Sequence, residues 1–122
     1  MNSVVNNIKP LSEAAVTVAA NHLQDILSKA IMYTADHTAV VVYDSQCPLA
    51  VTLTEAYRRC LPGANFIDFY ATTPDDVMSA FKPLVPEDLV VLIQSTSFRL
   101  NAFRLRVELF AQSLKVIEHP HL

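Results

Sequence analysis

The sequence predicts a three-layer, Rossmann-like α/β domain in which a four-stranded parallel sheet lies between helices. Two short segments, 38–44 and 88–94, are almost entirely apolar, which is typical of strands buried on both faces. Helical and strand patterns alternate along the chain, and such alternation implies a parallel sheet. The 122 residues are 52% hydrophobic and 17% charged, so one globular domain spanning 1–122 is expected.

The first helix is expected to begin after Ser12, which can cap it, and to run to about Tyr33. Apolar residues recur there at helical spacing and predict the buried stripe. The stripe comprises Val16, Ala19, Ala20, Leu23, Ile26, Leu27, Ala30 and Ile31. The β-branched segment 38–44 follows as the first strand.

The second helix is expected to begin at Pro48, because proline suits the first helical position, and to end at 62–63. Its predicted buried stripe is Leu49, Leu53, Ala56, Tyr57 and Cys60. Segment 65–71 is the second strand, and Asp68 places it at an edge of the sheet.

Three agreeing signals at 73–76 predict the start of a third helix, which Pro83 and Pro86 end: a threonine cap, a proline at the first position and acidic residues in the first turn. Val77, Phe81 and Leu84 should face inward. The third strand is 88–94, a fourth helix covers about 100–113, and the fourth strand is 115–119.

The strands at 38–44 and 88–94 are the most apolar and therefore belong in the middle, which favours the order 2-1-3-4. The order 3-2-1-4 is the main alternative. Connection handedness then places the second helix on one face and the third and fourth on the other, with the first helix completing the first face.

Composition excludes several classes of function. The net charge of −3 argues against nucleic-acid binding, and no apolar run is long enough to span a membrane. The only glycine, Gly63, excludes a dinucleotide fingerprint and a P-loop, which need several glycines. With two cysteines and no signal-peptide pattern, a cytoplasmic location is expected.

Candidate ligand contacts follow the two central strands. Because the carboxyl ends of parallel strands meet at one edge, a crevice is expected there. The candidates are Asp44, Ser45, Ser95, Thr96, Ser97 and Arg99. Two helix N-termini at the same place would favour an anion or a nucleotide. The competing interpretation is that these hydroxyls and carboxylates cap helices.

Other reactive side chains give no complete catalytic or metal site. Cys47 is expected near a helix start, where the dipole can lower a thiol pKa, but position 53 lacks the arginine of a phosphatase loop. His119 and His121 alternate as strand ligands could, yet no third ligand is evident, so solvation of the chain end is expected. We therefore predict no catalytic residue, no metal and no cofactor in this chain.

Two segments carry a family resemblance. The first runs from Ala19 to Asp44 and is a long amphipathic helix leading through a turn into Ala-Val-Val-Val-Tyr-Asp. The second is Asp-Leu-Val-Val-Leu-Ile-Gln-Ser-Thr-Ser-Phe-Arg at 88–99, followed by an arginine-bearing helix and Lys-Val-Ile-Glu-His. Together they resemble the N-terminal domain of the aminopeptidase T (leucyl aminopeptidase) family of metallopeptidases and of the related dihydroxypyridine dioxygenases.

This resemblance implies an accessory α/β domain whose matching hydroxyls are Ser95, Thr96 and Ser97. It also implies that the metal ligands lie in a C-terminal domain, so this chain alone should not hydrolyse peptides. Together with the fourth strand at the chain end and the modest charge, it leads us to expect an N-terminal fragment. Its expected partners are the C-terminal domain and further copies of the chain. A stand-alone anion- or nucleotide-binding module and a dimerisation domain using the fourth helix are the alternatives.

Overall fold

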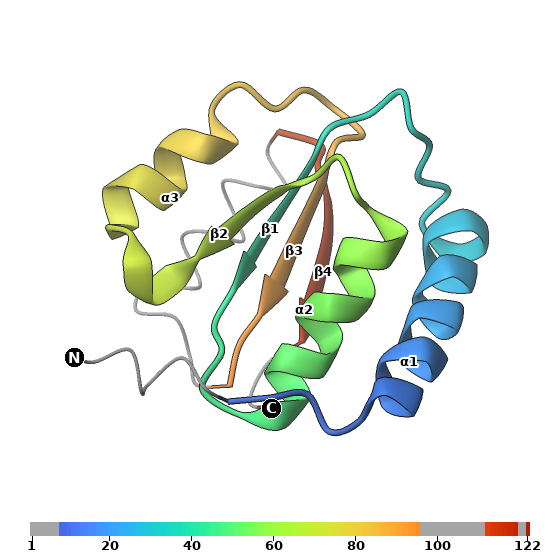
Figure 1. The fold of residues 1–122 in the computed structure, drawn as a ribbon. Helices are drawn as coiled ribbons and strands as arrows, with labels where there is room; N and C mark the ends of the chain where they lie inside the picture. Colours follow the sequence, from blue (N-terminus) through green and yellow to red (C-terminus); the bar gives the residue numbers. More distant parts are fainter. Residues whose placement is uncertain (1–7, 96–111, 120–121) are drawn as a thin grey trace.

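The structure, a computed structural model, describes residues 8–95, 112–119 and 122. The described residues form an all-parallel, four-stranded sheet in the order β2-β1-β3-β4 (Figure 1). Its strands are β1 (Ala39–Tyr43), β2 (Asn65–Asp68), β3 (Leu89–Ile93) and β4 (Lys115–His119). The predicted α/β class and strand order 2-1-3-4 are therefore confirmed.

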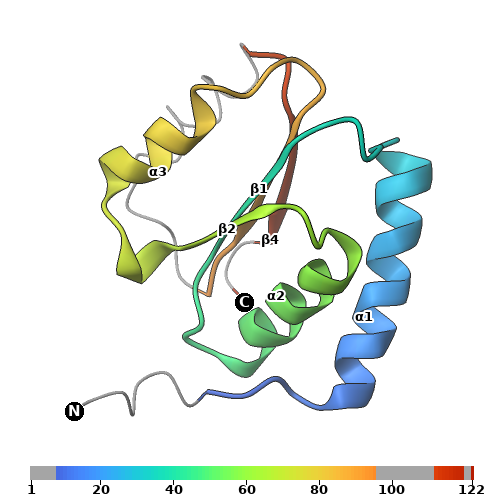
Figure 2. The same cartoon turned by 45° about the horizontal axis from the view of Figure 1, so that its top comes forward.

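Helices cover both faces of the sheet. The helical elements are α1 (Glu13–Asp25), η2 (Ile26–Ala30), α2 (Pro48–Cys60), η3 (Phe69–Ala71) and α3 (Pro74–Phe81). Figure 2 shows α1 and α2 on one side of the strands and α3 on the other. This agrees with the predicted placement of the first three helices. Residues 100–111 of the predicted fourth helix lie outside the described residues, and residues 112–113, expected at its end, form a turn.

The central strands are buried on both faces, as their apolar sequences predict. All five residues of β3 are buried, and in β1 only Tyr43 is partly exposed. Alternate residues point to opposite faces: Val41 and Val91 join the core under α1 and α2, while Val40 and Val90 join the core under α3. The sheet therefore separates two apolar cores.

The first helix differs from prediction at its C-terminal end. The α-helix ends at Asp25, a π-helical turn continues to Ala30, and Met32 adopts a left-handed backbone conformation with φ of 56°. A helix cannot continue through a left-handed residue, so it ends before Tyr33. Ile26 and Ala30, both expected in the buried stripe, are exposed.

The buried stripe of α2 is also different from the predicted one. Leu49 is 40% exposed, whereas Thr52 and Thr54 are buried. Each threonine hydroxyl donates to the carbonyl four residues earlier, at 2.7 Å and 2.8 Å respectively. Thr52 Oγ1 also accepts from the backbone N–H of Leu11 at 2.8 Å. These hydrogen bonds let two polar side chains face the core. Leu53, predicted in the stripe, is partly buried and packs against the core.

The second strand is shorter than predicted. β2 ends at Asp68, whose carboxylate accepts a hydrogen bond from the Tyr70 N–H at 2.9 Å. This bond caps the 3₁₀ turn η3, so the apolar run 69–71 leaves the sheet. β2 does lie at an edge of the sheet, as Asp68 suggested.

Candidate functional site

The carboxyl ends of β1 and β3 form the switch point of the sheet. The two strands are hydrogen-bonded neighbours, and Tyr43 lies opposite Ile93 in the register. After β1 the chain turns through α2 towards β2 on one side, and β4 lies on the other side of β3. In open α/β sheets, ligands bind beside such a point.

Asp44 and Ser95 meet at this switch point. Asp44 is fully buried. Its Oδ2 accepts a hydrogen bond from the Ser95 N–H at 2.8 Å, and its Oδ1 accepts from the Ser95 hydroxyl at 2.5 Å. Oδ1 also accepts from the Gln46 N–H at 3.1 Å. The carboxylate therefore ties the loop after β1 to the loop after β3.

The other candidates are placed less fully. Ser45 lies next to Asp44 and is half-buried. Thr96, Ser97 and Arg99 lie outside the described residues. A ligand role for this set of residues stays a prediction.

The N-terminus of α2 lies next to the same loop. Cys47 is the N-cap residue, with an extended backbone, and Pro48 takes the first helical position as predicted. Within the part of the chain that the structure describes, no side chain of this cap accepts a hydrogen bond from the first turn, and that turn holds no acidic residue. Its N–H groups could therefore bind an anion.

His119, expected to be solvated, is instead half-buried and contacts Tyr57. Nε2 of His119 lies 2.7 Å from the Tyr57 hydroxyl, and the two rings meet edge to face with centroids 5.6 Å apart. Tyr57 is fully buried. Burial lowers the pKa of His119 and raises that of Tyr57, so both side chains favour their neutral forms. The sequence holds no local signal for this pair, because the residues are 62 positions apart.

Asp88 was predicted only as the start of a strand, but it forms a second buried carboxylate site. Its Oδ1 accepts from the Thr38 N–H at 2.9 Å and its Oδ2 from the Val85 N–H at 2.9 Å. Nδ1 of His37 lies 3.6 Å from Oδ1. The signal in the sequence is a charged residue directly before a fully apolar strand.

Among the described residues, no group of three or more His, Cys, Asp or Glu side chains is placed to hold a metal ion. His121, the proposed companion of His119, lies outside those residues. Cys47 and Cys60 are both free, and Cys60 Sγ donates to the Ala20 carbonyl at 3.2 Å. Cys60, expected in the core, is half-buried and packs against it.

Comparisons of the chain with protein-family models, with curated proteins and with solved structures find no match. Across residues 8–95, 112–119 and 122, no helix has the length and apolar character needed to cross a membrane.

Proposed function

We propose that this chain is a non-catalytic α/β domain of an aminopeptidase-T-like protein, where it frames a cleft or a subunit interface. The observation that carries the proposal is how the Asp44 carboxylate is hydrogen-bonded. Both of its oxygens accept hydrogen bonds from the chain itself, and the side chain is buried. A carboxylate satisfied in this way stabilises the fold and is poorly placed to bind a ligand.

The two segments that carry the family resemblance contain the central pair of strands, β1 and β3. This supports the proposed kinship at the level of architecture, while function depends on sites grafted on a fold. The proposal includes a C-terminal domain or further copies of the chain as partners. It also includes a cytoplasmic location, which the two free cysteines support.

The test is the substitution Asp44→Asn. An amide offers one acceptor oxygen and turns an NH₂ group toward N–H donors, so we expect a loss of about 1–3 kcal/mol in the free energy of unfolding. Urea denaturation followed by circular dichroism measures it. The matched control is Asp36→Asn in an exposed turn, which should change stability by less than about 0.5 kcal/mol.

The enzymatic part of the proposal is checked with the same variant. With zinc or cobalt ions, the 122-residue chain should hydrolyse leucine p-nitroanilide no faster than the metal ions alone. Hydrolysis by the chain that disappears in Asp44→Asn, with stability unchanged, would show that Asp44 is catalytic and that the proposal is wrong.

An anion- or nucleotide-binding module is the second candidate, favoured by the α2 N-terminus, which Cys47 leaves without a side-chain cap. Titration with inorganic phosphate or AMP, followed by NMR, separates the two. Shifts clustered at 44–47 and 95–99 would favour binding, and no shifts at all would exclude it. Dimerisation through the fourth helix is tested by light scattering, since a monomer at high concentration contradicts it.

A further inference from the structure

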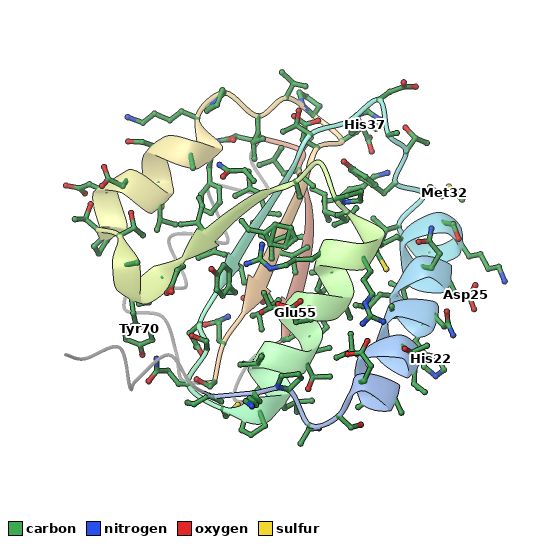
Figure 3. All side chains as sticks on the ribbon, viewed as in Figure 1. His22, Asp25, Met32, His37, Glu55 and Tyr70 are labelled. Carbon is green, nitrogen blue, oxygen red and sulfur yellow. The ribbon has the colours of Figure 1, made fainter. Side chains whose placement is uncertain are left out.

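A cavity of about 290 Å³ lies at the edge of the sheet where the strands begin, opposite the switch point. Its walls come from residues 33–39, which lead into β1, and from residues 60–64, which join α2 to β2. Figure 3 shows His37 at this end of the molecule. Ligand pockets usually measure about 300–1,000 Å³, so this cavity suits a single ring and is too small for a nucleotide or a peptide.

Most of the cavity wall is apolar. Ala39 and Leu61 are buried, and Ala64 is half-buried. Cys60 also lines the cavity, and burial raises the pKa of its thiol. The thiol therefore stays neutral at pH 7 and acts as a further weakly polar wall. A ligand with an apolar body is expected.

His37 lines the cavity, and two hydrogen bonds hold its backbone in position. Its N–H donates to the Thr34 carbonyl at 3.1 Å, and its carbonyl accepts from the Tyr33 hydroxyl at 2.6 Å. Nδ1 faces Asp88, which the Thr38 and Val85 N–H groups fix in turn. A carboxylate beside Nδ1 favours the tautomer with its proton there, which leaves Nε2 as an acceptor for a ligand.

The charge at this edge favours a neutral ligand. Burial and the negative charge of Asp88 raise the pKa of Tyr33, whose side chain lines the cavity. The same negative charge repels an anion, while the apolar wall disfavours a strongly hydrated cation.

We propose that this cavity binds a small, neutral, single-ring molecule bearing one hydroxyl group, of the phenol class. The hydroxyl donates to Nε2 of His37, and the ring lies against the apolar wall. This site goes beyond the proposed function and does not depend on it.

The experiment is an NMR titration of the protein with phenol, toluene and benzoate. Phenol should shift amides at 33–39 and 60–64, with a Kd on the order of 1 mM. Toluene has nearly the same shape but no hydroxyl, so it should bind about tenfold more weakly, and benzoate should bind more weakly than phenol. Absence of phenol shifts in these segments, or equal affinity for toluene, overturns the proposal.

Variants locate the interaction. In His37→Ala the preference for phenol over toluene should disappear, while His22→Ala on the exposed face of α1 should retain it (Figure 3). Ala64→Leu fills the cavity and should abolish binding of both probes, whereas Gly63→Ala should not, since a Cβ there would meet nothing within 4 Å. Retained preference in His37→Ala, or retained binding in a folded Ala64→Leu, contradicts the site. Ala64→Leu also keeps the proposal testable if His37→Ala does not fold.

Discussion

Asp44 and Asp88 fasten the two ends of the central strand pair. Asp44, after β1, accepts hydrogen bonds from Ser95, after β3; Asp88, before β3, accepts from the N–H of Thr38, before β1. Both side chains are buried, and a buried carboxylate is tolerated when N–H and O–H donors satisfy it. The two residues thus fix the register of β1 against β3 from both ends.

His119 should make stability depend on pH. Burial lowers its pKa from the ordinary 6.5, so the unfolded chain takes up a proton near pH 6.5 and the folded chain only at lower pH. The stability contributed by the neutral side chain is therefore fully present above about pH 6.5, and it is lost as the pH falls through the folded pKa. We expect the melting temperature to fall as the pH drops below about 6.5.

Substituting His119 tests whether it causes this pH dependence. His119→Gln should flatten the profile of melting temperature against pH in that window, as measured by circular dichroism. His22→Gln, on the exposed face of α1, should leave the profile as it is in the original chain. An unchanged profile in His119→Gln would show that other groups cause the loss.

At the scale of elements, the contribution of the Thr73 cap to stability can be measured at the start of α3. The Thr73 hydroxyl accepts a hydrogen bond from the Asp76 N–H at 3.1 Å. Thr73→Ala should lower the free energy of unfolding by about 1 kcal/mol, because one N–H of the first turn loses its partner. Ser79→Ala, exposed in the same helix, is the control and should change stability by less than about 0.5 kcal/mol. Equal effects in urea denaturation would exclude a capping role for Thr73.

Elements were predictable where local chemistry decides them. The Thr73 cap, the proline at the start of α2 and the apolar strands β1 and β3 all follow from neighbouring residues. Prediction failed where a distant contact or a side-chain hydrogen bond competes with hydrophobic spacing. Thr52 is buried because Leu11, 41 residues away, donates to it, and β2 ends early because Asp68 caps a turn.

In the candidate site, too, some contacts could be predicted from the sequence and others could not. Parallel strand order brings Asp44 near Ser95, which sequence reasoning can anticipate from strand ends alone. The contact of Tyr57 with His119 depends on how α2 lies across the sheet, and spacing along the chain contains no trace of that geometry.

At the scale of the whole molecule, the sheet should open from its edges. β1 and β3 have strand neighbours on both sides, whereas β2 and β4 each pair with one strand among the described residues. Hydrogen exchange measured by NMR should therefore be slowest for amides in 39–43 and 89–93, and faster in 65–68 and 115–119. Equal protection of all four strands would indicate that the edges are covered in solution.

The pairing of β1 with β3 also has a consequence during synthesis. Thr38 and Asp88, which join the starts of these strands, are 50 residues apart. At about 5–20 residues per second, a ribosome needs roughly 3 to 10 s to make that interval. During this interval, the edge of the nascent Ala-Val-Val-Val-Tyr segment that pairs with β3 has no partner. The unfinished polypeptide should therefore bind chaperones until Ile93 has been synthesised.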